Sequence, residues 1–241
     1  MAWYTEWFNT RYYQLLYGHR DNDDARGWVE MIMARAGLMP GMELLDMGCG
    51  RGRHAQLFAQ AGLNVVGIDL SESSVADARE QAPSVEFHVH DMRKPFATGR
   101  FDGVVCLFTS LGYSNSRADD QSAVDAAALA LKPGAIFVLD LFNGATVRHE
   151  LVKEECRIGL GVRFTINRSV EGDTIVKRIL VDDGGVQQNY VERVHAWTVG
   201  EVVGMVERAG LRIEAITNGP DPVPFDPDSS DRIVVWARKP R

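Results

Sequence analysis

A glycine-rich turn between a buried strand and a helix is the feature that most constrains the fold of this chain. The apolar run at 42–47 leads into the turn from Gly48 to Gly52, and a helical pattern begins at His54. Glycines at such a turn let the backbone approach a ligand closely, because a side chain there would collide with it. A strand, a glycine-rich turn and a helix in this order are typical of a nucleotide-binding βαβ unit. The turn therefore predicts an α/β fold with a ligand at the carboxyl end of this strand.

Short apolar runs and helical patterns alternate around this turn. Buried strands are expected at 42–47, 64–69, 85–89, 101–108 and 135–141. Helices are expected at 54–61, from a cap at Ser71 to Pro83, and at 119–131. Strand and helix alternating in this rhythm predict a mostly parallel, doubly wound sheet.

The pattern changes after residue 151. Residues 152–197 are strand-like, with turn signals at 171–173 and 182–185, which predicts an antiparallel meander of about three strands. A helix follows, with Thr198 and Glu201 as its capping box. Two last strands are expected at 211–217 and 232–237. The loop between them is too short for a crossover helix, so this pair is expected to be antiparallel.

The N-terminal segment is unusually aromatic. Seven of the first seventeen residues are Trp, Tyr or Phe, and several pairs are four residues apart, as neighbours on a helix would be. Two interpretations remain open: a helix packed onto the sheet, or an aromatic lid over a ligand.

The composition of the chain limits the kinds of molecule that it is expected to bind. The formal net charge is -7, whereas nucleic-acid binders normally carry a basic excess, so nucleic acid is disfavoured. The three cysteines are widely spaced, and neither a disulfide framework nor a metal site is expected. The sequence contains no signal peptide and no apolar run of the roughly 20 residues that cross a bilayer. These features predict a soluble cytoplasmic protein that does not contact a membrane.

Acidic residues stand at the ends of successive predicted strands. Asp69 lies 21 residues after Gly48, where a carboxylate can accept hydrogen bonds from the ribose hydroxyls of an adenosine. Asp46 stands just before the glycine turn, where it would oppose a pyrophosphate but suits a ligand with an ammonium and a sulfonium. Arg53 occupies the place where a dinucleotide fingerprint needs a small residue. These details favour an adenosyl sulfonium ligand over a dinucleotide.

Together these positions resemble the class I S-adenosylmethionine-dependent methyltransferases. The resemblance is carried by Leu44 to Gly52, Asp69, Asp91-Met92, Phe101-Asp102 and Leu131 to Gly134. It implies a Rossmann-like, doubly wound seven-stranded sheet with an antiparallel last strand, plus a small antiparallel β insertion. Four segments are expected: an N-terminal helical aromatic lid (1–37), the S-adenosylmethionine-binding core (38–150), the β insertion (151–197) and the C-terminal part of the core (198–241).

The resemblance also implies S-adenosylmethionine as the cofactor and a set of residues that bind it. In that family the first acid and the glycines border the methionine part, Asp69 the ribose, and Asp91 with Met92 the adenine. The predicted cofactor residues are Asp46, Gly48, Cys49, Gly50, Asp69, Leu70, Asp91, Met92 and Leu107.

The methyl acceptor is expected to be a small molecule that receives the methyl group on a nitrogen, oxygen or carbon atom. The segment 108–115 lacks the Asn/Asp-Pro-Pro-aromatic motif of enzymes that methylate DNA bases. The β insertion is similar to that of amino-sugar N-methyltransferases, where it covers the substrate and sometimes forms a homodimer contact. Tyr113 and His19 are the candidate catalytic residues; a packing tyrosine and a solvated turn are the alternatives for them.

Two other functions remain open from the sequence. An NAD(P)-dependent oxidoreductase would share the fold but not the ligand. A non-catalytic S-adenosylmethionine-binding module would bind the cofactor and transfer no methyl group.

Overall fold

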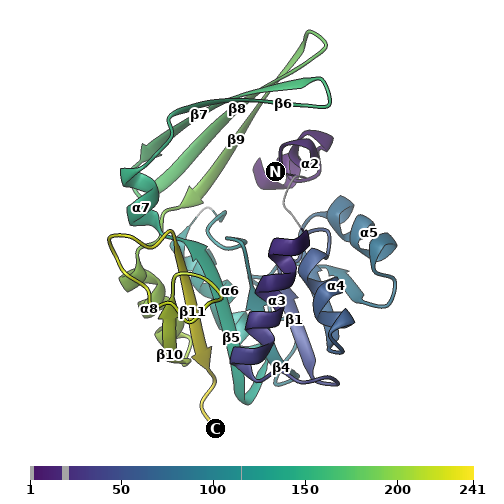
Figure 1. Cartoon of the computed structure of the whole chain (residues 1–241), viewed down its shortest axis with the longest axis vertical. Helices are drawn as coiled ribbons and strands as arrows, with labels where there is room; N and C mark the ends of the chain where they lie inside the picture. The colour runs from purple at the N-terminus through teal and green to yellow at the C-terminus, as the bar shows by residue number, and fades with distance from the viewer. Residues whose placement is uncertain (1–2, 18–21, 115) are drawn as a thin grey trace.

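In the computed structural model, which describes residues 3–17, 22–114 and 116–241, the β structure forms a seven-stranded sheet and a separate four-stranded sheet (Figure 1). The large sheet has the order β10-β11-β5-β4-β1-β2-β3. Its strands are β1 (Glu43–Met47), β2 (Asn64–Asp69), β3 (Glu86–Val89), β4 (Phe101–Cys106), β5 (Leu131–Phe142), β10 (Arg212–Thr217) and β11 (Arg232–Arg238). Only β11 is antiparallel to its neighbours, β5 and β10, which confirms the predicted Rossmann-like sheet with an antiparallel last strand.

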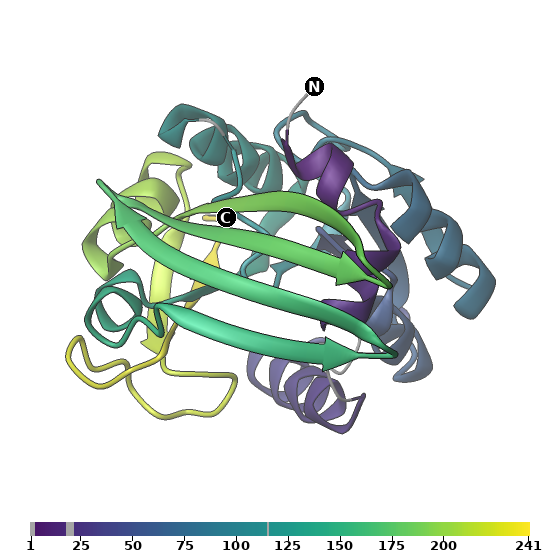
Figure 2. The ribbon, with the colours of Figure 1, turned by 90° about the horizontal axis from the view of Figure 1, so that it is seen from above.

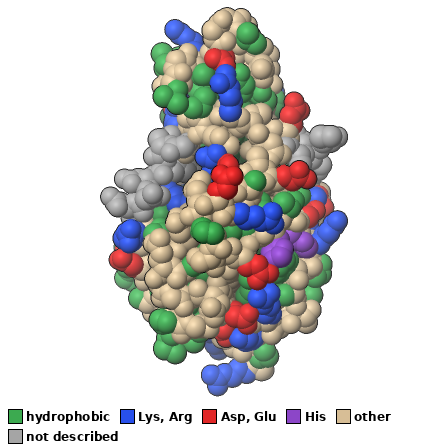
Figure 3. All heavy atoms as spheres, turned by 90° about the vertical axis from the view of Figure 1, so that its right-hand side faces the viewer, with side chains coloured by type: hydrophobic (Ala, Val, Ile, Leu, Met, Phe, Trp, Pro, Cys, Tyr) green, Lys and Arg blue, Asp and Glu red, His purple; other side chains and the backbone are tan. Residues whose placement is uncertain are grey.

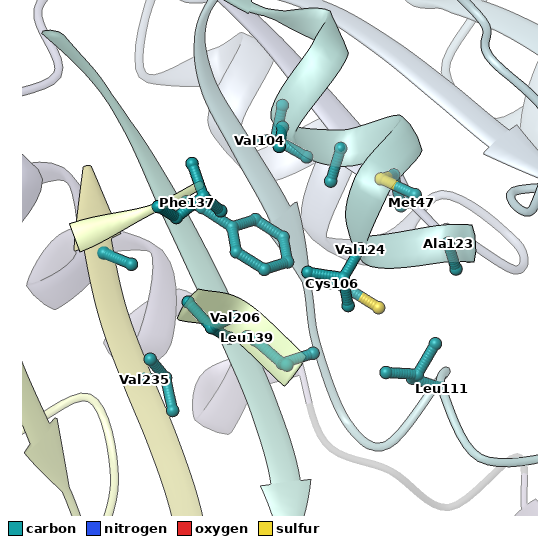
Figure 4. Packing of buried hydrophobic residues seen from close by; sticks show 14 of the residues in the cluster. Met47, Val104, Cys106, Leu111, Ala123, Val124, Phe137, Leu139, Val206 and Val235 are labelled. Atoms are coloured by element: carbon teal, nitrogen blue, oxygen red, sulfur yellow. The ribbon is translucent and has the colours of Figure 1, made fainter. Parts of the chain in front are cut away.

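Helices cover both faces of this sheet. One face carries α3 (Asn22–Ala36), α4 (Arg53–Gln60) and α5 (Glu72–Gln81), and the other carries α6 (Arg117–Ala130) and α8 (Val199–Arg208). Figure 4 shows the second layer, in which Val124 of α6 and Val206 of α8 pack against Phe137 and Leu139 of β5. Burying a side chain of this size contributes about 1.5–3 kcal/mol, so these contacts hold the sheet and helices together.

Local capping signals act as the sequence predicts. The Ser71 hydroxyl accepts a hydrogen bond from the backbone N–H of Ser74 at the start of α5. Thr198 and Glu201 form the capping box of α8. Both devices satisfy backbone N–H groups that have no partner within the helix.

Two strand boundaries differ from the prediction. β5 begins at Leu131 rather than near residue 135, because the chain continues directly from α6 into an extended segment that pairs with Phe101. β4 ends at Cys106 rather than at residue 108, because Phe108 and Thr109 have positive φ angles of 54° and 59°, which no strand accommodates.

The insertion contains four strands, so the expected three were wrong. They are β6 (Glu154–Gly159), β7 (Val162–Glu171), β8 (Thr174–Asp183) and β9 (Val186–His195), each antiparallel to the next. The missed hairpin turns at Leu160 and Gly161, with φ angles of 48° and 82°. Gly159 and Gly161 on either side of Leu160 were the available signal. A short helix, α7 (Gly144–His149), precedes the insertion and was not predicted.

The aromatic N-terminus packs on the small sheet and not on the large one. Its two helices, α1 (Trp3–Trp7) and α2 (Arg11–Tyr17), lie beneath the four strands of the insertion (Figure 2). Trp7 and Leu16 join a buried cluster with Phe164, Ile179 and Val181. By contrast, α3 packs on the large sheet. Residues 1–37 are therefore divided between the two sheets.

One face of the molecule carries side chains of both charges. On the face in Figure 3, Lys and Arg side chains of the described residues are interspersed with Asp and Glu. Within the described ranges, no helix combines the length and the apolar character needed to cross a membrane.

Candidate cofactor and acceptor site

A cavity of about 430 Å³ lies between the carboxyl edge of the large sheet and the helices beneath the small sheet. Parallel pairing places the ends of β1, β2, β3 and β4 at this edge, as expected for ligand sites in doubly wound sheets. All the predicted cofactor residues except Asp46 line it: Gly48, Cys49, Gly50, Asp69, Leu70, Asp91, Met92 and Leu107. Its opposite wall is aromatic, with Tyr4, Phe8, Tyr13, Tyr17 and Tyr113.

The glycine turn follows β1 and forms one wall of the cavity. The backbone N–H groups of Gly48 and Cys49 both donate to the carbonyl oxygen of Ile68, at 2.8 and 3.0 Å, which holds the turn against β2. A Cβ on Gly48 would lie 2.5 Å from the Cβ of Ser110, so no other residue fits there. The close approach of Ser110 makes Gly48 a steric requirement of the site.

Asp46 is the buried acid under this turn. It is 2% exposed, and among the described residues its Oδ2 atom has no hydrogen-bond partner. Burial, and next the nearby Asp69, raise the pKa of the Asp46 carboxyl to about 7. The backbone N–H of Ala55 opposes this shift, but a buried carboxylate oxygen without a partner is still costly, so the site favours a ligand that supplies a positive charge. The methionine part of S-adenosylmethionine carries such a group.

Asp69 ends β2 and joins two turns. Its Oδ2 accepts from the backbone N–H of Gly50 at 2.9 Å, and its Oδ1 accepts from that of Ser71 at 2.8 Å. Burial raises the pKa of this carboxyl above its usual value, although the backbone donors oppose the shift. Asp69 thus braces the glycine turn and lines the cavity at the same time.

Asp91 and Met92 follow β3 as predicted. The Asp91 carboxylate accepts hydrogen bonds from the Arg93 side chain at 2.7, 2.9 and 3.1 Å, and these contacts lower its pKa. Arg93 is a partner that the sequence did not suggest. Met92 lies close to Gly48, since a Cβ there would be 3.1 Å from the Met92 Cε.

The segment 107–111, hereafter the cavity loop, was predicted only in part from the sequence. All five of its residues line the cavity, although only Leu107 was predicted to bind the cofactor. The Ser110 hydroxyl donates to the carbonyl oxygen of Gly48 at 3.1 Å, which joins this loop to the glycine turn. No glycine marks the positive φ angles at Phe108 and Thr109, so no local signal announced the shape of the loop.

The candidate catalytic residues have different outcomes. Tyr113 lines the cavity, with its ring 5.3 Å from that of Phe8 in an edge-on arrangement. His19 lies outside the described residues.

Sequence reasoning also missed Asp120, which lines the cavity and accepts from the Ser114 hydroxyl at 2.6 Å. The Nδ1 atom of His195 lies 2.7 Å from the Oδ2 atom of Asp120. The two residues are 75 positions apart in the sequence, so only the fold brings them together. In the described ranges, no group of three or more His, Cys, Asp or Glu residues could hold a metal ion.

The residues of the cavity fit S-adenosylmethionine. Asp46, buried under the glycine turn beside the cavity, has an orphaned oxygen that suits a cation, and Gly48 lines the cavity without a side chain. Asp69 can accept from hydroxyl groups, and Met92 offers an apolar surface for a ring. The fold and the residues of this site match those expected of an S-adenosylmethionine-dependent methyltransferase.

Comparisons with known proteins agree with this class. A family model described as a methyltransferase domain matches residues 44–134. The chain is 29% identical over 219 residues to dTDP-3-amino-3,4,6-trideoxy-alpha-D-glucopyranose N,N-dimethyltransferase of Streptomyces venezuelae, covering 86% of this chain and 92% of the relative. It is 26% identical to dTDP-3-amino-3,6-dideoxy-alpha-D-glucopyranose N,N-dimethyltransferase of Streptomyces fradiae, covering 84% and 80%.

A solved structure shows the same fold. The S-adenosylmethionine-dependent methyltransferase from Clostridium acetobutylicum superposes with a TM-score of 0.81 at 16% identity, covering 95% of this chain and 96% of that one. The four-stranded insertion is therefore part of an overall architecture that another methyltransferase shares. Nothing in these comparisons favours the oxidoreductase or the non-catalytic module.

Proposed function

We propose that this enzyme transfers methyl groups to an amino nitrogen of a nucleotide-linked sugar. The observation that carries the proposal is the similarity to the two Streptomyces N,N-dimethyltransferases, which covers 86% and 84% of this chain. The helices α1 and α2 line the cavity and pack on the insertion, so a likeness that extends beyond the core bears on the acceptor as well as on the cofactor.

The cofactor is proposed to lie along the carboxyl edge of the large sheet. Asp46 and the glycine turn would hold its methionine part, Asp69 and Leu70 its ribose, and Asp91 with Met92 its adenine. When bound, S-adenosylmethionine supplies an electrophilic methyl group on a sulfonium. Support for this placement comes from the orphaned Asp46 oxygen and from the ends of successive strands meeting at one edge.

The aromatic wall is proposed to receive the acceptor. Phe8, Tyr13 and Tyr113 form a continuous set, with ring centroids 4.9 Å apart for Phe8–Tyr13 and 5.3 Å for Phe8–Tyr113. Aromatic faces attract ammonium groups, and tyrosine hydroxyls can hydrogen-bond sugar hydroxyls. Tyr113 stands beside the cavity loop, where its hydroxyl can orient the amine.

The protein's chemical task is positioning and exclusion of water. An amine must be neutral when it attacks, and it loses a proton once per methyl transferred. Holding donor and acceptor in line can account for about 7–11 kcal/mol of a barrier, so a dedicated base is not required. The aromatic wall of α1 and α2 would keep water out as a lid over the cavity.

Finer features belong to the same proposal. The acceptor would be a free small molecule rather than nucleic acid, and the enzyme would work in the cytoplasm. Of the four segments 1–37, 38–150, 151–197 and 198–241, the first would supply the lid through α1 and α2, and the others would act as core, insertion and core. Exposed apolar side chains on the insertion, among them Ile158 and Val191, offer a surface for a homodimer.

The test is turnover with a matched pair of sugars. The purified enzyme, S-adenosylmethionine and a dTDP-3-amino-sugar should yield products heavier by one and by two methyl groups, detected by mass spectrometry. The corresponding dTDP-sugar with a hydroxyl in place of the amine is the control and should remain unmodified. Methylation of the hydroxyl sugar alone, or of neither sugar, would contradict the proposal.

A further inference from the structure

A buried ion pair at the start of the last strand is connected to the wall of the cavity. Asp140, near the end of β5, is fully buried. Arg232, the first residue of β11, donates to both of its carboxylate oxygens, at 2.6 and 2.7 Å. The two contacts use two nitrogens of the planar guanidinium, a fit to the carboxylate that the single nitrogen of a Lys side chain does not offer.

Asp140 also anchors the cavity loop. Its Oδ2 accepts from the backbone N–H of Phe108 at 2.7 Å, and its main-chain oxygen accepts from that of Thr109 at 3.0 Å. The Thr109 hydroxyl in turn accepts from the backbone N–H of Phe142 at 3.0 Å. The end of β5 therefore makes three hydrogen bonds to two consecutive residues of the loop.

These two residues have a backbone conformation that they do not prefer. Phe108 and Thr109 have φ angles of 54° and 59°, in the left-handed region. A Cβ makes this region unfavourable, and β-branched threonine is an especially poor fit. Such residues persist only where their surroundings hold them. The contacts with Asp140 and Phe142 are the surroundings that hold them here.

Arg232 also contacts the loop directly, through the ring of Phe108. Its guanidinium lies 5.2 Å from the centre of that ring, and Trp28 of α3 lies 5.2 Å away from it. His54 at the start of α4 stacks on the ring at 4.9 Å. Since Phe108 lines the cavity and Ser110 bonds to Gly48, a shift of the loop would disturb the glycine turn as well.

We propose that Asp140 and Arg232 are positioning residues for cofactor binding. The pair holds the cavity loop in its left-handed form, so that Leu107, Phe108 and Ser110 complete the wall against the glycine turn. Neither residue needs to touch the cofactor, since Asp140 and Arg232 are absent from the lining of the cavity. The inference concerns the cofactor and holds whatever the methyl acceptor is.

The experiment measures binding of S-adenosylhomocysteine by calorimetry, without turnover. Arg232→Gln should weaken the affinity about tenfold, the scale expected when a strained loop is released. If that variant does not fold, the pair Asp140→Asn with Arg232→Gln removes both charges together and should show the same loss. Arg238→Gln is the control, because Arg238 also makes an ion pair on β11, with Glu214, but at the opposite end of the strand. Its affinity should equal that of the wild type.

A glycine variant separates positioning from general stability. Thr109→Gly, added to Arg232→Gln, should recover much of the lost affinity, because glycine adopts the left-handed conformation without strain. Thermal unfolding should show no matching recovery, since the added glycine removes the Thr109 hydroxyl contact. Unchanged affinity in the Arg232 variants would overturn the proposal. So would a loss that the glycine leaves untouched, or an equal loss in Arg238→Gln.

Discussion

Trp7 and Glu192 are 185 positions apart and share a hydrogen bond of 2.6 Å from the indole nitrogen of Trp7 to the Glu192 carboxylate. The same carboxylate accepts from the Tyr17 hydroxyl at 2.8 Å, and Lys177 lies 3.5 Å away. Glu192 is therefore the point at which both N-terminal helices are fastened to the small sheet. Because Tyr17 also lines the cavity, this attachment forms part of the site.

Glu192→Gln should loosen the N-terminal helices. Replacing a charged acceptor weakens each of its hydrogen bonds, with a cost of about 1–3 kcal/mol to the attachment. Amide hydrogen exchange in α1 and α2 should become faster, while exchange in the large sheet stays unchanged. Gln187→Ala, at an exposed position on the same strand, is the control and should exchange like the wild type. Equal protection of α1 and α2 in the two variants would show that Glu192 is not the fastening point.

Asp69→Ala should abolish tight cofactor binding while the fold persists. The substitution removes an acceptor proposed for the ribose and releases the Gly50 N–H that braces the glycine turn. Loss of hydrogen bonds to a charged group predicts an affinity for S-adenosylhomocysteine lower by at least about tenfold. Asp125→Asn, an exposed change on α6, serves as control. An Asp69→Ala protein that binds as tightly as this control would contradict the site assignment.

Asp46 should make the stability of the cofactor-free protein depend on pH. Its pKa rises from 3.8 to about 7 on folding, so the folded state binds a proton that the unfolded state has released between these values. The stabilisation is present in full below about pH 4 and is lost as pH rises toward 7, by on the order of 4 kcal/mol. Urea unfolding of wild type and Asp46→Asn across this range measures the difference. Parallel pH curves for the two proteins would disprove the shift.

The same group should couple cofactor binding to proton release. If the ligand's ammonium meets Asp46 in its ionised form, affinity for S-adenosylhomocysteine should increase as pH rises toward 7. Calorimetry in buffers of different ionisation enthalpy counts the proton released, which Asp46→Asn should not show. A binding enthalpy that does not vary with the buffer in the wild type would place the cation elsewhere.

Tyr113→Phe should affect the reaction with the acceptor and leave binding of the cofactor unchanged. The change keeps the ring contact with Phe8 and removes only the hydroxyl, so affinity for S-adenosylhomocysteine should stay the same. If the hydroxyl orients the amine, kcat/KM for the amino-sugar should fall about tenfold, the worth of one hydrogen bond of this kind. An unchanged kcat/KM would make Tyr113 a packing residue, as the alternative interpretation held.

Local chemistry explains where sequence reasoning succeeded. The glycine turn, the Ser71 cap and the capping box at Thr198 each depend on residues within a few positions of one another, and each formed as predicted. The alternation of strands and helices likewise predicted the large sheet, and the short loop before the last strand predicted that this strand is antiparallel. The hairpin at Leu160 and Gly161 was missed although Gly159 and Gly161 flank it, because Leu160 has a positive φ angle that its side chain does not favour.

The amino-acid sequence by itself determined the Rossmann-like core, the glycine turn and the acids that end its strands, because these follow from short-range periodicity and backbone sterics. Tertiary structure alone decided that the aromatic helices pack on the insertion, where Trp7 finds Glu192. It also decided the left-handed bend at Phe108, which no nearby residue requires and which Asp140 and Arg232 stabilise from other strands. Contacts of this kind join residues far apart in the chain, so only the folded sheet brings them together.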